Sequence, residues 1–453
     1  MMLYSAFSMR CLAAICIYLL YNTACMAQDA SAARHALLDL LDTLPQKTEA
    51  KVICGQVIRG ETPSELDSYF AEYYLALDTS SGKLPAMVEI MAHDEDGNFV
   101  SDKDFVIDRI TALWDTGTVT YLSLRPPNPE NGGSMWVRYD TMPHPADLSV
   151  VYTESTSQNL QFKRNMDSVA VILEELKNRG IPVFFESFNE ANHNVYWWSW
   201  DPDMAKKMTL WKYCYNYFTN VKGLDNLIWV LEYLGGSTAI PAEFDSLVGL
   251  VDIIGLSIYD SLPEDKYRPV IDTFKTLFNV PVGFSESGPN IKKSADDSVV
   301  VNHQYESWDN MILIDALKNH YPEITFFNRW SSVWSIIHQQ NDSVFMNDPL
   351  LLNREQLYSE LVQNIPTASP PFSDSEMQHK IRIFPNPATS HICFTNLSTQ
   401  AMFTLMDLNG RQLCSGLIKN NHIDISFLAP GFYLLQLKTD KSLHRFRLVV
   451  AGN

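Results

Sequence analysis

Two glutamates follow apolar runs and stand beside groups that suit sugar chemistry. Glu190 ends the stretch FFESFNE, and Glu286 stands in GFSESGP. Hydrolysis of a glycosidic bond needs two carboxyl groups, because one protonates the leaving oxygen while the other attacks the anomeric carbon or activates water. Asn189 precedes Glu190, and a cluster of rings follows it that could cover the apolar faces of sugars: Tyr196, Trp197, Trp198 and Trp200. This combination predicts glycoside hydrolysis.

Simpler interpretations of the same residues remain open. Glu186, Glu232 and Asp260 also end or follow apolar runs, and an acid at such a place is often a helix cap or a solvated loop residue. Clustered tryptophans often fill a core. The order of the features favours the catalytic interpretation, since an Asn-Glu pair precedes the rings and a second glutamate follows three runs later.

Other chemistries fit less well. The stretch GFSESG is not a GxSxG nucleophile elbow, because position 287 is serine. Glu190 and His193 form one E-x-x-H pair, which does not make a di-iron site. The sequence has no HExxH motif and no P-loop. We therefore expect no metal and no organic cofactor.

A barrel would bring these acids together. Short apolar runs alternate with amphipathic segments and are expected to be strands, at 51–57, 86–92, 118–124, 181–187, 226–232, 251–257, 280–286 and 331–337. Eight such units predict a (β/α)8 TIM barrel, whose active site lies at the C-terminal ends of the strands. A doubly wound sheet is the alternative, but no GxGxxG follows any run.

The chain divides by composition. Residues 366–378 are rich in Pro and Ser and predict a linker. Residues 379–453 contain eight Lys and Arg against three Asp and Glu, a net charge of +5, whereas residues 28–378 contain 25 against 50, a net charge of −25. Alternating runs after the linker predict a small antiparallel β-sandwich. The total net charge of −19 argues against a nucleic-acid partner.

The first 27 residues predict a secretory signal peptide. Arg10 is the only charged residue in them, an apolar run CLAAICIYLLY follows it, and TACMA offers small residues for cleavage near Ala27. We therefore expect an exported protein with a catalytic unit over 28–365. Four of the seven cysteines lie outside this segment, and a bridge between Cys393 and Cys414 is left open.

The first unit resembles glycoside hydrolase family 26, whose members are mostly endo-β-1,4-mannanases. The resemblance rests on IPVFFESFNEANHNVYWW (181–198), LWKYCYNYFTNVKGLDNLIWV (210–230), VDIIGLSIYD (251–260) and VPVGFSESGP (280–289). It implies a retaining hydrolase with Glu190 as acid/base and Glu286 as nucleophile. It also implies roles for four aromatic residues: Tyr259 orients the nucleophile, Trp197 and Trp198 face the sugar, and Trp334 on the eighth strand forms the floor of the sugar site.

The sequence departs from the family at several positions. The family reads Arg-Pro-x-His-Glu before the acid, whereas this chain has Glu186 in place of the Arg and Asn189 in place of the His. Arg125, in SLRPPNP, stands where a His is common, so the two positions could have exchanged charge. We expect Asn189 and Arg125 to contact substrate. These departures leave β-1,3-xylan, mixed-linkage β-glucan and a non-catalytic glycan-binding barrel as alternatives to β-1,4-mannan hydrolysis.

The C-terminal segment resembles the type A sorting domain of the type IX secretion system of Bacteroidetes. The matching stretches are IRIFPNPAT (381–389), FTLMDLNGRQL (403–413) and LAPGFYLLQLKT (428–439). The resemblance implies the secretion machinery as partner and a secreted or surface-attached protein that has crossed the periplasm. A generic sandwich or a carbohydrate-binding module is the alternative.

Overall fold

The computed structural model describes most of the chain. It covers residues 30–364 with gaps at 48–50, 61, 94–101, 131, 138–144, 146, 237–239, 261, 263–264 and 290–307, and residues 382–450 with gaps at 385–387, 389, 396, 398–400, 407–411, 419–421, 430 and 440–442. The chain divides into two compact units, Met1–Pro366 and Thr367–Asn453. The predicted signal peptide and linker lie outside the described residues.

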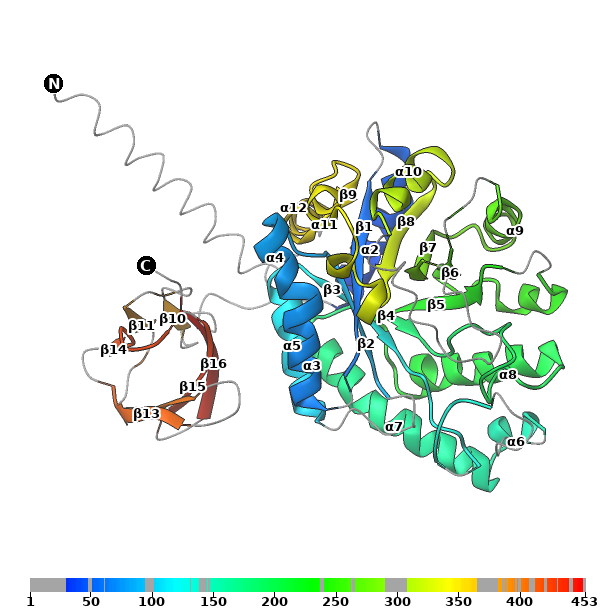
Figure 1. The fold of residues 1–453 in the computed structure, drawn as a ribbon. Helices are drawn as coiled ribbons and strands as arrows, with labels where there is room; N and C mark the ends of the chain where they lie inside the picture. Colours follow the sequence, from blue (N-terminus) through cyan, green and yellow to red (C-terminus); the bar gives the residue numbers. More distant parts are fainter. Residues whose placement is uncertain are drawn as a thin grey trace. The chain divides into compact units, whose positions relative to one another are not determined.

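The first unit is a closed parallel barrel, and the predicted (β/α)8 architecture is confirmed (Figure 1). Within the described ranges eight strands pair in the order β2-β3-β4-β5-β6-β7-β8-β1, and β1 pairs again with β2 to close the ring. The strands are β1 (Val52–Ile58), β2 (Met87–Met91), β3 (Val119–Ser123), β4 (Val183–Glu186), β5 (Leu227–Leu234), β6 (Ile253–Tyr259), β7 (Val282–Gly288) and β8 (Ile324–Arg329). A short strand, β9 (Leu351–Leu352), adds to β1.

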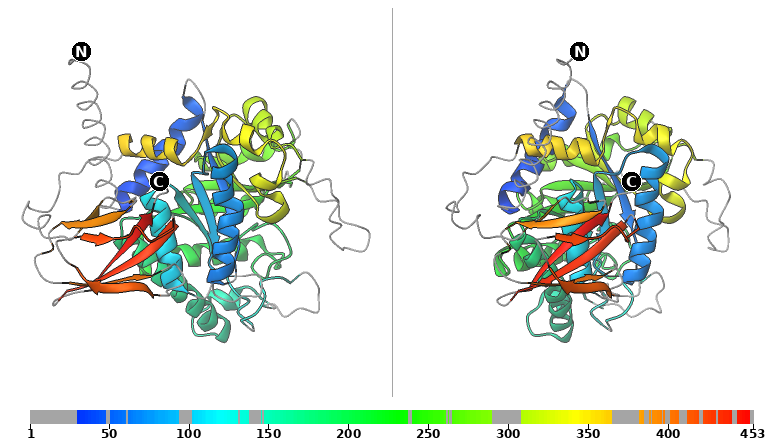
Figure 2. Two further views of the ribbon diagram at one scale, coloured as in Figure 1. Left: turned by 60° about the vertical axis from the view of Figure 1, so that its left-hand side comes forward. Right: turned by 90° about the vertical axis from the view of Figure 1, so that its left-hand side faces the viewer.

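Helices surround the strands, as two further views show (Figure 2). They are α2 (Ala30–Thr43), α3 (Pro63–Phe70), α4 (Ala76–Ser81), α5 (Lys103–Asp115), α6 (Ser149–Tyr152), α7 (Ser157–Asn178), α8 (Met204–Tyr215), α9 (Arg268–Phe278), α10 (Met311–Asn319), α11 (Asp342–Met346) and α12 (Arg354–Asn364). Side-chain caps set several of their starts: Thr62 and Glu65 form a capping box on α3, and Asp203 accepts backbone N–H groups of α8. None of the described helices is long and apolar enough to span a membrane.

Shorter helical turns fill the remaining connections. The π-helical turns η2 (Ala71–Leu75) and η3 (Asn216–Val221) extend α3 and α8. The 3-10 turn η1 (Leu44–Gln46) follows α2. Between β5 and β6 the described residues contain one helical element, the 3-10 turn η4 (Ala242–Leu247). This connection therefore departs from the regular pattern of a strand followed by an α-helix.

Seven of the eight predicted strands lie within two residues of the observed ones, and the eighth was misplaced. The run at 331–337 forms two 3-10 turns, η5 (Ser332–Trp334) and η6 (Ile336–His338), whereas β8 occupies the earlier run 324–329. Ser332 has φ 61°, which a strand cannot accommodate. The Ile336 N–H donates to the Gln56 side chain and its C=O accepts from Asn310, so side chains replace a strand ladder. Trp334 therefore lies after the barrel strand.

The second unit has two antiparallel sheets, so the predicted sandwich is confirmed. One sheet has the order β10-β11-β14 and the other the order β13-β12-β15-β16. The strands are β10 (Arg382–Phe384), β11 (His391–Thr395), β12 (Met402–Met406), β13 (Gln412–Leu417), β14 (His422–Asp424), β15 (Gly431–Lys438) and β16 (Leu443–Val450). Its core contains Ile392, Leu405, Leu435 and Leu448. Cys393 and Cys414 are free thiols.

The barrel interior is packed tightly enough to require a glycine in β7. A Cβ atom on Gly283 would lie 2.0 Å from the Phe326 ring of the neighbouring strand. The ring itself is completely buried and contacts Tyr121 and Phe184 across the barrel. Phe326 has no space into which it could move without displacing those rings.

We therefore expect Gly283→Ala to lower the free energy of unfolding by about 1–3 kcal/mol through overpacking. Urea unfolding followed by tryptophan fluorescence measures the change. Gly236→Ala is the matched control, because a Cβ atom there meets nothing within 4 Å. Equal stability of Gly283→Ala and the unchanged protein would contradict the tight packing of this layer.

Candidate active site

Five described glutamates converge inside the barrel toward the C-terminal ends of its strands. Each is at most 5% exposed: Glu89 on β2, Glu186 on β4, Glu190 after β4, Glu232 on β5 and Glu286 on β7. Arg125, which follows β3 and is 3% exposed, forms ion pairs with Glu286 and, at 3.9 Å, with Glu89. The cluster therefore carries more potential negative charge than positive charge. No group of His, Cys, Asp or Glu in the described part of the chain is arranged to hold a metal ion.

Glu286 receives donors on both carboxylate oxygens. Arg125 and the Asn189 amide (2.7 Å) donate to Oε1, and the Tyr259 hydroxyl donates to Oε2 at 3.1 Å. Such donors stabilise an ionised carboxylate. Burial nevertheless raises the pKa of Glu286 to about 7, Arg125 limits the rise, and the charge of Glu190 adds to it. Glu286 can thus be an ionised nucleophile near and above neutral pH.

Glu190 has different surroundings. The Ser257 hydroxyl donates to its Oε1 at 2.7 Å, and the His193 Nδ1 atom lies 2.6 Å from its Oε2. The Tyr196 hydroxyl lies farther away, at 3.5 Å from Oε2. No arginine or lysine of the described residues forms an ion pair with Glu190. Glu190 thus lacks the arginine that contacts Glu286.

The backbone is strained at two places in this site. Arg125 has φ 41° and Glu190 has φ 40°, and both lie in the left-handed region that residues with a side chain rarely occupy. Arg125 comes two residues after the end of β3 and Glu190 four residues after the end of β4, and both side chains are buried in the site. Non-glycine residues in this conformation persist only where the surrounding structure holds them, and they are common at functional sites.

Arg125 and Glu186 do not form a simple exchanged ion pair. The Arg125 guanidinium contacts Glu286 and lies over the Trp330 ring, 5.1 Å from its centroid. Glu186 instead accepts a hydrogen bond from the Tyr121 hydroxyl at 2.5 Å. Burial raises the pKa of Glu186, and the positive charge of Arg125 opposes that rise. Arg125 thus acts on the carboxyl groups, and the predicted contact with substrate stays a prediction.

The tryptophans after Glu190 belong to the core. Trp197 is 1% exposed and Trp198 is 2% exposed. Their indole N–H groups donate to the carbonyl oxygens of Pro126 and Asn189, each at 2.8 Å. Trp198 also stacks on Tyr196 with a centroid distance of 4.7 Å. The contacts indicate that the rings hold the segment that carries Asn189, and their predicted contact with sugar stays a prediction.

Trp334 supports the site from the turn after β8. Its ring meets Tyr259 edge to face at a centroid distance of 6.1 Å, and its Nε1 donates to the carbonyl oxygen of Pro289 at 3.1 Å. A Cβ atom on Gly288 would lie 2.4 Å from the Trp334 ring, so this approach requires glycine. The prediction that Trp334 lies on the eighth strand is wrong, since β8 ends at Arg329; Trp330 directly follows the strand, and its ring lies against Arg125.

Sequence reasoning missed two aromatic residues near the site. Trp330 could have been found, because it follows the apolar run 324–327, which was not chosen as the eighth strand. Trp136 follows no apolar run that would have marked it as a residue at a strand end. It lies after β3, pairs with Tyr196 in an isolated β-bridge and packs on that ring at a centroid distance of 4.7 Å.

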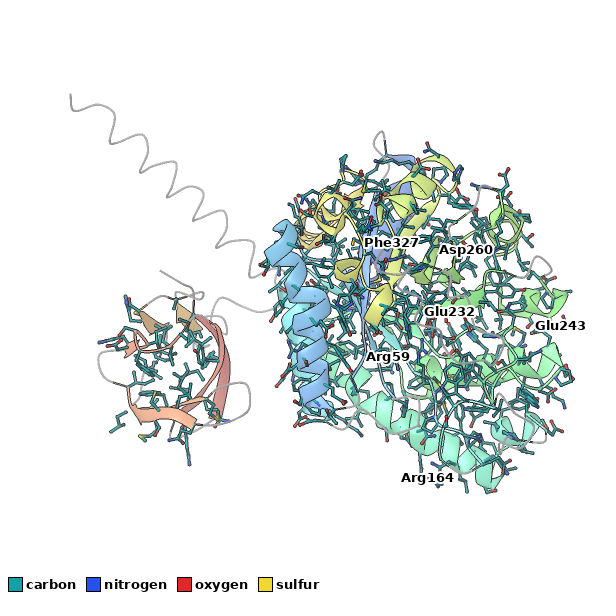
Figure 3. The ribbon with its side chains drawn as sticks, in the orientation of Figure 1. Arg59, Arg164, Glu232, Glu243, Asp260 and Phe327 are labelled. Atoms are coloured by element: carbon teal, nitrogen blue, oxygen red, sulfur yellow. The ribbon has the colours of Figure 1, made fainter. Side chains whose placement is uncertain are left out.

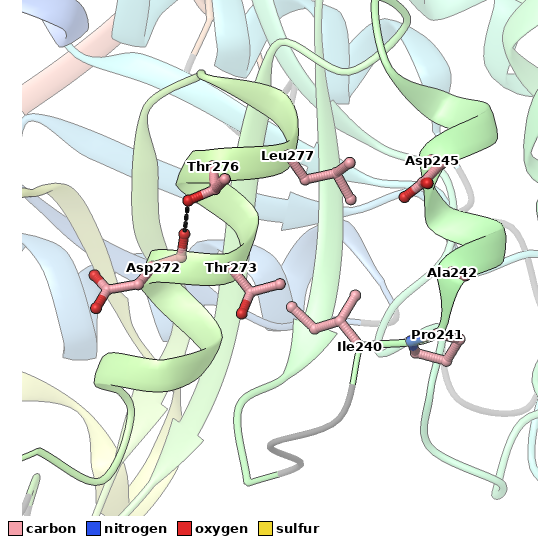
Figure 4. A pocket seen from close by; sticks show the side chains of 8 residues that line it. All are labelled: Ile240, Pro241, Ala242, Asp245, Asp272, Thr273, Thr276 and Leu277. Carbon is pink, nitrogen blue, oxygen red and sulfur yellow. Dashed lines mark hydrogen bonds between the residues drawn. The ribbon is translucent and has the colours of Figure 1, made fainter.

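A separate crevice of about 490 Å³ opens between η4 and α9 (Figure 4). It is lined by Ile240, Pro241, Ala242, Asp245, Asp272, Thr273, Thr276 and Leu277. None of the five glutamates lines it, so it is not part of the carboxylate cluster.

Comparisons with known proteins address both units. Residues 382–451 match the secretion system C-terminal sorting domain, and the second unit is such a domain. Mannan endo-1,4-beta-mannosidase of Bacillus subtilis (strain 168) is 26% identical over 259 residues, which cover 55% of this chain and 66% of that protein. Mannan endo-1,4-beta-mannosidase A and B of Caldalkalibacillus mannanilyticus is 25% identical over 335 residues, which cover 70% and 60%. The chain thus spans less than two thirds of these relatives.

Solved structures share the fold of the first unit. A Bacillus subtilis mannanase has a TM-score of 0.58 at 24% identity, over 72% of this chain and 93% of that one. A beta-mannanase from a symbiotic protist of the termite Reticulitermes speratus has a TM-score of 0.55 at 18% identity, over 74% and 97%. Residues 27–355, most of the chain, match glycosyl hydrolase family 26. The chain therefore belongs to glycosyl hydrolase family 26.

Proposed function

We propose that the barrel unit is a retaining endo-β-glycanase that hydrolyses β-1,4-mannan. The observation that carries this proposal is the pair Glu190 and Glu286, two buried carboxyl groups with unlike partners in one barrel. Glu286 accepts hydrogen bonds from Arg125, Asn189 and Tyr259, which suits an ionised nucleophile. Among the described residues, Glu190 contacts Ser257 and one basic side chain, that of His193. These surroundings, which differ from those of Glu286, suit a proton donor.

The reaction proceeds by double displacement. A carboxylate oxygen of Glu286 attacks the anomeric carbon while Glu190 gives its proton to the leaving glycosidic oxygen, so the glycosidic bond breaks as a glycosyl ester forms. Glu190 then removes a proton from water, the water oxygen attacks the anomeric carbon, and Glu286 leaves as a carboxylate. Tyr259 and Arg125 hold the Glu286 carboxylate. Asn189 donates to Glu286, and its Oδ1 atom, which has no hydrogen-bond partner among the described residues, is the atom expected to accept from a sugar hydroxyl.

The choice of mannan rests on family membership and on relatives named mannan endo-1,4-beta-mannosidase. Arg125, Glu186 and Asn189 depart from the pattern of the family. These departures make mixed-linkage β-glucan and β-1,3-xylan the competing substrates in any assay. A barrel that binds glycan without cutting it is the competing outcome of another class.

We further propose that the protein is exported through the periplasm and then secreted or held at the cell surface. The sorting domain at 382–451 supports recognition by type IX secretion machinery. Residues 1–27 act in this proposal as a removable signal peptide, with a catalytic unit over 28–365 and a linker over 366–378. The sorting domain takes no part in catalysis.

The enzyme should release reducing sugar from mannan or glucomannan. Glu286→Ala should remove all measurable release, because no nucleophile remains. Glu190→Ala should lower kcat/KM on polymer by roughly 10²–10⁴-fold, the usual contribution of general acid–base catalysis. Glu243→Ala removes an exposed glutamate and is the matched control. Full activity in either site variant would contradict its role. Binding to any of mannan, glucomannan, β-1,3-xylan or mixed-linkage β-glucan, with release of sugar from none of them, would refute the enzyme.

The pH profile should depend on Arg125. Glu286 attacks only when ionised, so its raised pKa of about 7 predicts that kcat/KM falls as pH drops below about 7. The Arg125 charge favours ionised Glu286, so Arg125→Gln should raise that pKa and move the acid limb to higher pH. Arg125→Lys keeps the charge and should move it less. Measurements of kcat/KM against pH check this, and a limb that stays in place or moves to lower pH would contradict it.

A further inference from the structure

Glu232 has no role in the double displacement, yet it contacts the segment that carries Glu190. Its Oε2 accepts the backbone N–H of Glu190 at 3.2 Å, and its backbone C=O accepts the N–H of Ala191 at 3.3 Å. Two residues farther along, the Asn192 amide bonds the C=O and N–H of Leu234 at 3.1 and 2.7 Å. These four hydrogen bonds attach the segment 190–192 to β5.

The residue whose N–H Glu232 holds, Glu190, has a strained backbone conformation. Glu190 has φ 40°, and a residue with a side chain keeps that conformation only where its surroundings hold it. The Glu232 carboxyl group bonds the N–H of the strained residue itself, and it is completely buried, so water does not compete for the N–H. Removing this acceptor would leave a buried N–H unsatisfied and free the peptide to relax.

The carboxyl group of Glu186 has a hydrogen-bond partner on one of its two oxygens. One of its oxygens, Oε2, accepts from the Tyr121 hydroxyl, while Oε1 is buried and has no hydrogen-bond partner among the described residues. Glu186 pairs with Val230 across β4 and β5, so Glu232, two residues farther along β5, points to the same side of the sheet as Glu186. Two buried carboxyl groups side by side cannot both be ionised cheaply, and a proton between them satisfies both.

The donors indicate where this proton resides. Glu232 already accepts from Ser285 at 2.6 Å on Oε1 and from the Glu190 N–H on Oε2, as an ionised carboxylate would. Glu186 Oε1 is the oxygen without a donor, so it is the one that can carry a proton and donate it. A protonated Glu186 and an ionised Glu232 leave no carboxyl oxygen of the pair without a partner.

We propose that Glu186 and Glu232 form a proton-sharing pair that positions Glu190, in which Glu186 Oε1–H donates to Glu232 and Glu232 holds the backbone N–H of Glu190. The positioning role rests on the proposed function, in which Glu190 is the proton donor. The pair contributes one negative charge, where two ionised carboxylates would contribute two, and this lessens repulsion of an ionised Glu286. Glu186 and Glu232 are positioning residues, since neither reaches the reacting atoms in this arrangement.

The surrounding elements give the pair a definite pH behaviour. The titratable and charged groups that face it are Glu89 on β2, Tyr121 on β3, Arg125 after β3, Glu190 after β4 and Glu286 on β7. Burial raises the pKa of Glu232 and of Glu186. The folded protein then keeps a proton that the unfolded chain releases above the ordinary glutamate pKa. The contribution to stability is therefore complete at low pH and is lost as pH rises through the folded pKa.

The first experiment detects the proton itself. The infrared spectrum of the full-length protein minus that of Glu186→Gln, both at neutral pH, should show a protonated-carboxyl C=O band that belongs to Glu186, because the other carboxyl groups cancel in the difference. Gln Nε2 can donate to Glu232 in place of the acid O–H, so Glu186→Gln should fold, keep most of its kcat/KM and show a weaker fall of Tm with rising pH. Glu243→Gln is the matched control, because Glu243 is exposed at the periphery of the barrel unit whereas Glu232 lies in its interior (Figure 3). A difference spectrum without this band overturns the shared proton.

The second experiment tests positioning. Glu232→Ala should lower kcat/KM on polymer by roughly 10–100-fold, as expected when a catalytic group is misplaced. A dinitrophenyl glycoside of the same sugar needs no proton for its leaving group, so its kcat/KM should fall far less. Glu232→Gln keeps an acceptor for the Glu190 N–H and should recover most of the polymer activity. Equal losses on both substrates, or no loss on polymer, overturn the positioning role.

These outcomes separate the inference from the proposed function. If the unchanged protein releases no sugar from any substrate, the proposed function fails, while the infrared band and the pH dependence of Tm still decide whether the pair shares a proton. If the unchanged protein is active and the band is absent, the inference fails alone.

Discussion

The candidate site depends on one guanidinium group among buried carboxyl groups. Arg125 contacts Glu286 and approaches Glu89, and within the described residues it is the only arginine or lysine paired with the cluster. Burying several carboxylates without compensation would cost more free energy than a folded domain can supply. The other features of the site reduce that cost: hydroxyl donors on Ser123, Ser257 and Tyr259, and carboxyl groups whose pKa values are raised by burial.

The closed ring of strands brings the carboxyl groups together and shields them from water. Parallel strands that all end at one face bring Glu89 and Glu286 together although they lie far apart in the sequence. The same closure leaves no sheet edge through which water could reach the cluster from the side. The donors are therefore fixed before substrate arrives, which is the condition for electrostatic stabilisation of a charged transition state.

Sequence reasoning predicted the barrel and placed Glu190 and Glu286 at the C-terminal ends of its strands. It could do so because apolar runs indicate buried strands, and the active site of such a barrel lies at their C-terminal ends. It placed the eighth strand wrongly, since SSVWSII has the composition of a buried strand, and only the contacts of Gln56 and Asn310 with Ile336 show otherwise. It could not predict that Trp197 would be buried, or that Arg125 after β3 would contact Glu286 on β7, four strands farther around the barrel. Both depend on packing between segments that are distant in the chain.

The close approach of Trp334 to Gly288 limits how this site could change during evolution. The indole reaches Tyr259 only because position 288 has no side chain. Any other residue there would push away the ring that backs the tyrosine, and through it disturb the hydroxyl that Glu286 accepts from. A substitution at Gly288, which has no functional group of its own, would thus disturb the same carboxyl group as a substitution at Tyr259. The turn after β8 and the last residue of β7 are expected to vary only together.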